Sequence, residues 1–301
     1  MGGLSELEIL AFIRARFPGG EALTDDCGAL PPAPPGQMLL ATTDLMEEGV
    51  HFSRDWHPPA LLARKLLAVN LSDLDASGAA PAGFTLTLAL PRDLDRAWLE
   101  PFLAALAEAA RAASLPVLGG DTVGRAEGIG LGMTAFGHAA RWLKRDGLRP
   151  GDELFVDQPL GRSLRGLRKL QGGSRDLADA DIAAHLDPQP NLGLGLKLAA
   201  LEGVHACMDL SDGLSRDLRS MAQASGLSIE VDAALGGDAI RGGEDYARCF
   251  GSDLPRAELE ARLGLPLIPV GRAFPKEDAP LFLYDGSSRL PLDDLSFDHF
   301  R

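Results

Sequence analysis

The sequence predicts an α/β (α+β) protein of two domains, and three observations support this class. The chain has 301 residues, which is about the length of two average domains. Helical and strand-like hydrophobic patterns are mixed in both halves of the chain. A polar stretch with glycine and proline, "HAARWLKRDGLRPGD" (138–152), interrupts these patterns near the middle. We therefore place the domains at residues 1–138 and 139–301.

In the N-terminal half, apolar residues recur at helical spacing in three segments, and prolines precede the second. The third contains Pro101, which predicts that the helix begins near this residue or kinks there. "MLLATTD" predicts a buried strand, and the strictly alternating "FTLTLALP" predicts a half-buried one. The expected helices cover residues 5–17, 58–74 and 96–114, and the expected strands cover 38–44, 84–91, 115–122 and 128–137.

The C-terminal half repeats this mixture of elements. Gly226 closes one expected helix, and Asp285-Gly286 lies between two apolar runs, which is typical of a hairpin turn. The expected helices cover residues 161–171, 192–203, 212–225 and 254–264, and the expected strands cover 153–156, 204–210, 227–232, 265–274 and the hairpin 281–292. No solenoid repeat or low-complexity tract is present.

Composition and charge exclude several classes of protein. The chain is 46% hydrophobic and 24% charged, as expected for a globular protein. Its net charge of −14 disfavours binding to nucleic acid or to an anionic membrane. No apolar run is long enough to span a membrane, and the N-terminus is a poor signal peptide. The three cysteines form no zinc or disulfide pattern, so we expect a cytoplasmic protein.

Aspartates follow apolar segments at five places, often beside Ser or Thr. The stretches are "LTDDCG", "LLATTD", "LLAVNLSDLD", "LPVLGGD" and "VHACMDLSD". Because apolar runs are buried, their ends lie near the rim of the core, where gathered carboxylates repel one another. Mg²⁺ relieves this repulsion, since it takes oxygen ligands and keeps waters that phosphates can replace. The repeated pattern therefore predicts a magnesium site.

A structural interpretation of each aspartate stands beside this one. A single Asp after a strand is usually a helix cap or a turn former, and Asp212 suits the cap of the 212–225 helix. We expect Asp217 to be a solvated helix-face residue, and Asp25 and Asp75 to take no part in a site. No P-loop, dinucleotide fingerprint, H-E-x-x-H or G-x-S-x-G frame occurs. Carboxylates and glycine turns without a nucleophile motif favour metal-assisted phosphoryl transfer.

The motifs as a set resemble the thiamine-monophosphate kinase family, whose superfamily also holds aminoimidazole ribonucleotide synthetase and selenophosphate synthetase. The matching stretches run in family order from about residue 6 to residue 300. They are "DDC", "TTDLMEEGVHF", "KLLAVNLSDLDASGAAP", "FTLTLALP", "LGGDT", "RDGLRPGD", "DLSDGLSRDL", "GGEDY" and "FDHF". The resemblance implies transfer of the γ-phosphoryl of ATP to thiamine monophosphate, which gives thiamine diphosphate.

The resemblance also implies an architecture and a set of site residues. It implies an AIR synthetase-like homodimer, in which N-terminal strands of both subunits form a barrel and the nucleotide lies with several Mg²⁺ ions between the domains. No covalent catalytic residue is implied. The implied metal ligands are Asp26, Thr42, Thr43, Asp44, Asp73, Asp121, Asp209 and Asp212. ATP would contact Gly120, Asp121, Arg145 and Ser211, and thiamine monophosphate would contact His51, Glu244 and Phe297.

The sequence departs from the family pattern at three places. "ALTDD" stands where a glycine-rich "GIGDD" is usual, Arg162 replaces an acid in "GRS", and the 232–241 segment is short. These departures concern the substrate side of the site. Three alternatives therefore stay open: a related enzyme with another acceptor, an ATP- and Mg²⁺-binding dimer without turnover, and an acidic divalent-ion-binding protein without a nucleotide site.

Overall fold

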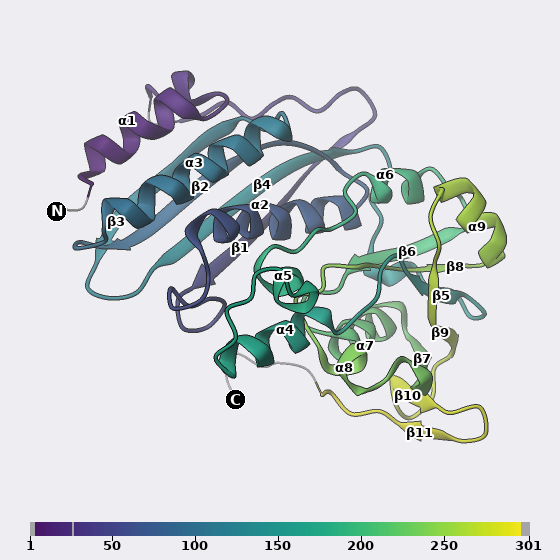
Figure 1. The fold of residues 1–301 in the computed structure, drawn as a ribbon. Coiled ribbons are helices and arrows are strands. Elements are labelled where there is room, and N and C mark those ends of the chain that lie inside the picture. The colour runs from purple at the N-terminus through teal and green to yellow at the C-terminus, as the bar shows by residue number, and fades with distance from the viewer. Residues whose placement is uncertain (1–3, 26, 296–301) are drawn as a thin grey trace. The chain divides into compact units, whose positions relative to one another are not determined.

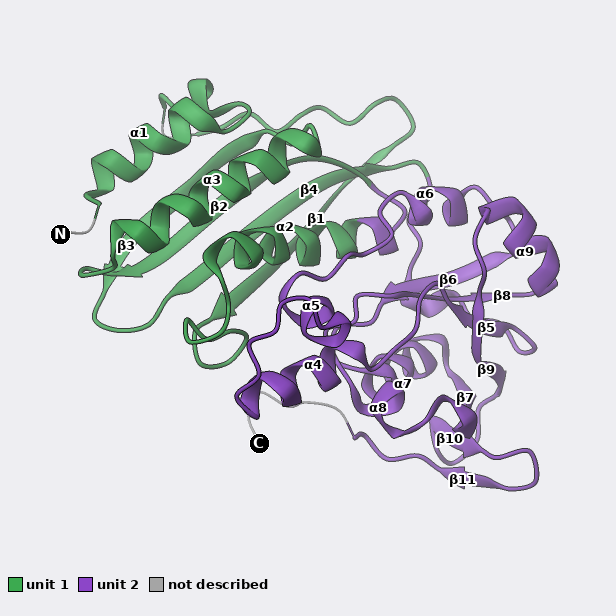
Figure 2. Ribbon diagram, in the orientation of Figure 1, with its two compact units in different colours: residues 1–74, 80–140 green, residues 75–79, 141–301 purple. Residues whose placement is uncertain are grey.

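The structure, a computed structural model, describes residues 4–25 and 27–295. The chain divides into two compact units (Figure 2): unit 1 holds residues 1–74 and 80–140, and unit 2 holds residues 75–79 and 141–301. Each unit contains helices and its own β-sheet, which confirms the α/β (α+β) class. Within the described part of the chain, no helix has the length and apolar character needed to cross a membrane.

Unit 1 is built on a four-stranded sheet with the strand order β1-β4-β2-β3. β1 and β2 pair antiparallel with β4, and β3 pairs parallel with β2. Figure 1 shows α2 and α3 lying along one face of this sheet. Its elements are α1 (Glu6–Arg16), η1 (Gly20–Ala22), β1 (Met38–Glu47), α2 (Pro59–Ala76), β2 (Ala80–Pro91), α3 (Arg96–Ala112), β3 (Val117–Arg125) and β4 (Gly130–Ala139).

Local signals in the sequence fix the starts of two of these helices. α1 begins with a capping box, in which the Ser5 hydroxyl accepts the Glu8 N–H and the Glu8 carboxylate accepts the Ser5 N–H. α3 begins after Asp95, whose carboxylate accepts the Ala97 N–H at 2.9 Å. The helix expected at 96–114 is present as Arg96–Ala112, and it begins five residues before Pro101. The helix includes Pro101 on its exposed side, because its buried apolar stripe holds the turn together.

The strand predicted at 38–44 is present, but the prediction that it is buried was wrong. β1 is an edge strand, and its alternate residues Leu39, Ala41, Thr43 and Leu45 are exposed. Leu45 keeps 56% of its side-chain surface exposed. The helices cover the opposite set of side chains, so one face of this sheet carries apolar residues that this chain leaves open.

Unit 2 contains a mixed seven-stranded sheet with the order β11-β10-β7-β9-β5-β8-β6. Its elements are η2 (Arg145–Gly147), β5 (Glu153–Val156), α4 (Arg162–Gln171), α5 (Ala180–Leu186), α6 (Leu194–Ala199), β6 (Val204–Asp209), α7 (Leu214–Ser225), β7 (Leu227–Asp232), η3 (Ala233–Leu235), α8 (Gly237–Arg241), β8 (Arg248–Ser252), α9 (Arg256–Leu263), β9 (Ile268–Pro275), β10 (Leu281–Tyr284) and β11 (Arg289–Pro291).

The two faces of this sheet are packed in separate apolar clusters. On β5, Leu154 and Val156 belong to one cluster, which includes residues of α7, while Phe155 belongs to the other, which includes residues of α6 and α9. This division follows from the two-residue period of a strand. Both faces are covered at β6, which is buried along its whole length and reads as a nearly continuous apolar run.

Most elements expected in the C-terminal half are present, and the hairpin is confirmed by antiparallel pairing of β10 with β11. Three elements had no clear signal in the sequence, namely α5, α8 and β8. β8 follows the "GGEDY" motif directly, and its buried positions include the charged Arg248, which disrupts the apolar pattern of a core strand.

Candidate functional site

In unit 1, the predicted ligands of β1 and α2 meet on the helix-covered side of the sheet. The Thr42 hydroxyl donates a hydrogen bond of 2.6 Å to the Asp73 carboxylate. Asp44 lies two residues after Thr42, so its side chain points to the same face of the strand. The structure therefore brings Thr42 and Asp73 into contact, and Asp44 lies on the same face of β1.

Thr43 points the other way, because side chains alternate along a strand. Its hydroxyl donates to the Met133 carbonyl at 3.1 Å and accepts from the Thr134 hydroxyl at 3.0 Å on the neighbouring strand β4. The structure does not bring this hydroxyl together with Asp73. His51 follows β1, and its Nδ1 accepts the Glu47 N–H at 3.0 Å, which fixes the orientation of the ring.

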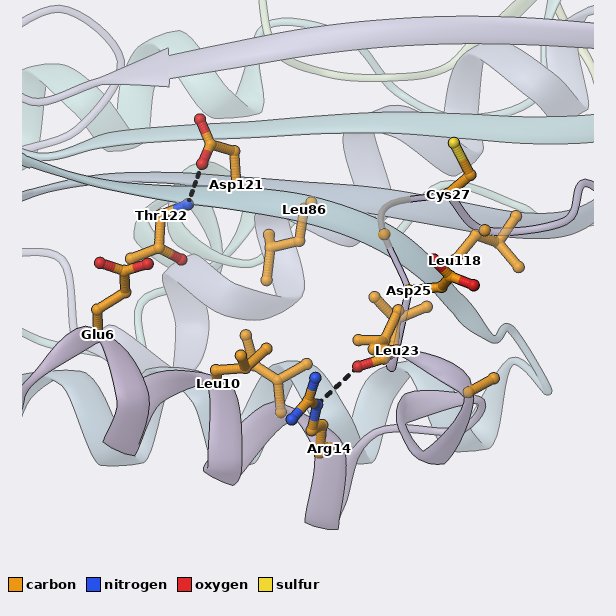
Figure 3. Close-up of a pocket in the computed structure, with 16 residues that line it drawn as sticks. Glu6, Leu10, Arg14, Leu23, Asp25, Cys27, Leu86, Leu118, Asp121 and Thr122 are labelled. Atoms are coloured by element: carbon orange, nitrogen blue, oxygen red, sulfur yellow. Dashed lines mark hydrogen bonds between the residues drawn. The ribbon is translucent and has the colours of Figure 1, made fainter.

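The predicted nucleotide residues Gly120 and Asp121 lie on edge strand β3, where they line a pocket of about 260 Å³. Figure 3 shows this pocket between α1 and β3, with Asp121 and Thr122 at one end and Cys27 and Asp25 at the other. The Asp121 carboxylate accepts the Thr122 N–H at 2.9 Å. Gly120 is required here, since a Cβ at this position would lie 2.0 Å from the Leu86 carbonyl oxygen.

In unit 2, the stretch "DLSDG" forms the loop between β6 and α7, and three aspartates gather around it. Asp209 ends β6 and is buried, and Asp212 lies in the loop. Asp217, from within α7, accepts the N–H groups of Asp212 and Gly213 at 3.2 and 3.1 Å on one carboxylate oxygen. The prediction that Asp217 is solvated was therefore wrong, because the helix turns it inward to hold the loop.

The alternative role of Asp212 as a helix cap is not seen. α7 begins at Leu214 after Gly213, and no side chain caps it. The carboxylate that stabilises this end of the helix is Asp217, which reaches back from the helix interior to the loop. Periodicity alone gave no signal for this contact, because position 217 reads as one of the polar positions of the helix.

Burial and neighbouring charge perturb Asp217 strongly. Desolvation, together with the negative charges of Asp212 and Asp209, raises its pKa to about 8, while the hydrogen bond from Gly213 and the charge of Arg145 oppose the rise. Arg145, the first residue of η2, lies next to α7, where the Ser225 hydroxyl donates to its carbonyl at 3.0 Å. Asp209 and Asp212 are the carboxylates whose charges act on Asp217, and a cation bound beside them would offset that charge.

The raised pKa of Asp217 predicts a stability that depends on pH. The folded state holds this pKa at about 8, above the ordinary 3.8, so folding favours the protonated form and stability is lost as the pH rises between these values. In Asp217→Asn, one amide oxygen accepts both loop N–H groups without charge. We expect its Tm in EDTA to exceed that of the wild type by at least about 3 °C near pH 8.5, and by less near pH 5.

Thermal unfolding followed by circular dichroism measures this difference in Tm between the two proteins. Added Mg²⁺ serves as the control, since a bound cation stabilises the ionised carboxylates of the wild type and narrows the gap. Equal Tm differences at the two pH values would show that the charge of Asp217 is not what the variant removes.

The "GGEDY" motif packs directly against the "DLSDG" loop. The Glu244 N–H donates to the Ser211 carbonyl at 2.7 Å. Gly243 permits this approach, since a Cβ there would lie 2.6 Å from the same carbonyl oxygen. Glu244 also lies 3.3 Å from Nδ1 of the buried His185, which in turn contacts the Ser163 hydroxyl at 3.0 Å. The predicted residues Ser211 and Glu244 are therefore neighbours.

Asp245 fixes the same motif to the start of α4. Its two carboxylate oxygens accept the Gly161 N–H at 2.5 Å and the Ser163 N–H at 3.1 Å. Burial raises the pKa of this carboxyl, and the bonds from Gly161 and Ser163 oppose the rise. Arg162, which replaces the acid usual in the family, points toward the start of α5, where it donates to the Ala180 carbonyl at 3.0 Å.

Two predicted residues, Asp26 and Phe297, lie outside the described residues. Among the residues that the structure describes, no group of three or more His, Cys, Asp or Glu side chains is placed to hold a metal ion. Mg²⁺ is commonly held by one or two carboxylates together with waters and substrate phosphates. The paired carboxylates and the hydroxyl of Thr42 fit that mode of binding, because they are oxygen donors in small groups.

The chain is similar to known proteins over most of its length. Two family models match the chain: AIR synthase related protein, N-terminal domain, over residues 24–139, and AIR synthase related protein, C-terminal domain, over residues 149–258. The chain is 38% identical over 300 residues to thiamine-monophosphate kinase of Escherichia coli, a match that covers 92% of this chain and 90% of the relative.

Two solved structures are similar over nearly the whole chain. Thiamine-monophosphate kinase from Stenotrophomonas maltophilia has a TM-score of 0.78 and 31% identity, and the match covers 96% of this chain and 100% of the other. AaThiL complexed with AMPPCP and TMP has a TM-score of 0.75 and 28% identity, covering 99% of this chain and 97% of the other.

Proposed function

This chain belongs to the thiamine-monophosphate kinase family, and from this premise we propose how its residues carry out the reaction. The enzyme phosphorylates thiamine monophosphate with ATP and forms thiamine diphosphate. The observation that carries the proposal for the residues is the aspartate cluster of the "DLSDG" loop. Asp209 ends β6, Asp212 lies in the loop, and the buried Asp217 accepts the Asp212 N–H, so oxygen donors gather where a cation that accompanies phosphates would be held.

The acceptor supplies its own nucleophile. A phosphate monoester has its second pKa near about 6, so an oxygen of thiamine monophosphate is largely ionised at neutral pH. No strong general base is then needed, and the protein's task is to position two polyanions and to offset their charge. Mg²⁺, when bound, supplies the charge neutralisation that in-line transfer requires.

We propose that oxygen donors of each unit bind Mg²⁺. In unit 1 they are Thr42, Asp44 and Asp73, with Asp26, Thr43 and Asp121 assigned from the family motifs. In unit 2 they are Asp209 and Asp212, and the buried Asp217 holds the loop by accepting the N–H groups of Asp212 and Gly213. We propose that residues 1–138 form one functional domain and residues 139–301 the other. We also propose that the protein is cytoplasmic.

We also propose the contacts with the two substrates. Gly120 and Asp121 line the pocket beside α1 and suit contact with ATP, and Ser211 and Arg145 suit contact with its phosphates. Glu244, His51 and Phe297 would contact thiamine monophosphate. Two departures from the family pattern concern the acceptor side of the site. They are the short 232–241 segment, which forms η3 and α8, and Arg162, which donates to the Ala180 carbonyl. We expect them to give this side of the site a shape specific to this chain.

Product analysis tests the function directly. The pure protein is incubated with ATP, Mg²⁺ and thiamine monophosphate, and the thiamine species are separated by chromatography, with an EDTA control. We expect thiamine diphosphate only when Mg²⁺ is present. ATP binding without this product would point to another acceptor or to a non-catalytic dimer, and absence of ATP-dependent thermal stabilisation would favour a divalent-ion-binding protein.

We propose in addition that the protein is a homodimer. The sheet of unit 1 leaves Leu39 and Leu45 exposed on β1, and Val123 is exposed on β3. An apolar sheet face with two open edge strands is stabilised when a second copy covers it. We expect light scattering after size exclusion to give twice the mass of one chain, and Leu45→Arg to give one chain. A wild-type monomer at assay concentration would contradict the proposal.

A further inference from the structure

Unit 2 contains a buried ion pair that the proposed reaction does not use. Arg248, the first residue of β8, is fully buried, and Asp75 is 3% exposed. Arg248 Nε donates to Asp75 Oδ2 at 2.7 Å. Asp75 also accepts the N–H groups of Gly193 at 2.6 Å and Gly195 at 3.0 Å. The carboxylate of Asp75, which we expected to take no part in a site, is thus engaged on both oxygens within the protein.

The same arginine binds the backbone of the "GGEDY" motif. Arg248 Nη1 donates to the Tyr246 carbonyl at 3.1 Å, and the Arg248 N–H donates to Asp157 at 2.7 Å. Arg248 also pairs with Asp209 in the antiparallel register of β6 and β8. The guanidinium thus bridges the Asp75 carboxylate and the carbonyl of Tyr246 in the "GGEDY" motif.

The segment that Arg248 holds has a strained backbone. Glu244 has a φ of 60° and Tyr246 a φ of 50°, left-handed values that residues other than glycine rarely adopt. Such conformations persist only where the surroundings determine them, and they gather at functional sites. The Tyr246 N–H donates to the Leu210 carbonyl at 2.9 Å, so one side of this residue is held by the "DLSDG" loop and the other by Arg248.

Stability alone does not explain well why the chain buries the Arg248–Asp75 ion pair. Replacing a buried ion pair by apolar residues of similar volume is often neutral or stabilising, whereas a buried pair specifies one arrangement of the groups it joins. The planar guanidinium is suited to that task, because its fixed donors point in two directions at once. A lysine keeps the charge, but its single ammonium group cannot reproduce the contacts with Asp75 and with the Tyr246 carbonyl in the same geometry.

We propose that Arg248 is a positioning residue for the acceptor substrate. By bridging Asp75 and the Tyr246 carbonyl, it holds the left-handed 244–246 segment and so sets the place of the Glu244 carboxylate. This inference rests on the proposed contact of Glu244 with thiamine monophosphate. It predicts that substitution of Arg248 changes the KM for thiamine monophosphate more than the KM for ATP.

The test compares Arg248→Lys and Asp75→Asn with Arg289→Met as a matched control. Arg289 also makes ion pairs, with Glu230 and Glu277, and stacks on two phenylalanine rings, but it lies on β11 away from this motif. In Arg248→Lys and Asp75→Asn, we expect the KM for thiamine monophosphate to rise about tenfold and the KM for ATP to stay within about twofold. Arg289→Met should lower Tm and leave both KM values unchanged.

A second readout does not depend on turnover. Peptide-resolved hydrogen exchange should show loss of protection at residues 243–248 in Arg248→Lys and not in Arg289→Met. An unchanged KM for thiamine monophosphate in a folded Arg248→Lys, or unchanged exchange at 243–248, would overturn the inference. Absence of thiamine diphosphate with the wild type would overturn the proposed function instead, and the exchange experiment would still decide whether Arg248 holds the segment.

Discussion

Asp212→Asn is expected to lower kcat by about 10³-fold while the protein remains folded. The substitution removes one negative charge where the proposed cation binds and keeps the shape of the side chain. The loop itself is held by the backbone N–H of residue 212, which the variant retains as a donor to Asp217. Loss of turnover without loss of structure is the result that assigns this carboxylate to the site.

Stability provides the internal check on Asp212→Asn. The charge of Asp212 contributes to the raised pKa of Asp217, so its removal lowers the repulsion in the cluster. We therefore expect a Tm equal to or above that of the wild type in the absence of metal. Asp253→Asn, at a side chain that is 58% exposed, is the matched control and should keep normal kcat. Near-normal turnover in Asp212→Asn would remove it from the proposed ligands.

Asp73→Asn is expected to lower kcat by about 10²-fold and to raise the Mg²⁺ concentration needed for half-maximal rate. The carboxylate of Asp73 accepts the Thr42 hydroxyl at 2.6 Å, and an amide oxygen can accept this bond as well. The variant therefore removes charge from the unit 1 group and keeps its geometry. Initial rates over a Mg²⁺ titration, with both substrates saturating, measure the two effects.

Two further variants separate charge from geometry in unit 1. Thr42→Val removes the hydroxyl that orients Asp73 and should cost about tenfold in rate, because a hydrogen bond to a charged group is lost. Asp93→Asn, at an exposed turn residue after β2, is the matched carboxylate control and should behave as the wild type. If Asp73→Asn lowered kcat without any change in Mg²⁺ dependence, its role would be in folding or in the acceptor site.

Much of the fold could be predicted from short-range signals. The capping box at Ser5, the alternation of "FTLTLALP" and the Asp285-Gly286 turn each act over a few residues, and the structure places a helix, a strand and a hairpin there. The family resemblance depends on motifs spread over the whole chain, and the match over 92% of the chain confirms it. These features are local or ordered along the sequence, so no tertiary information was needed to read them.

Errors arose where contacts between distant residues decide the outcome. The exposure of β1 depends on its place at the sheet edge, which strand periodicity does not encode. Asp217 is buried because the loop before α7 folds back over it and offers two N–H donors. β8 was not expected, because this short strand begins with an arginine, which only the tertiary structure buries.

The sequence by itself determined the fold class, the family and the residue types of a phosphoryl-transfer site, since these follow from periodicity and from motifs in a fixed order. Only the tertiary structure decided which oxygens meet. It directs Thr42 and Thr43 to opposite faces of one strand, and it brings Asp75 to Arg248 across 173 positions of sequence. The physical reason is that burial and charge pairing depend on distances in space, and those are set when the sheets and helices pack.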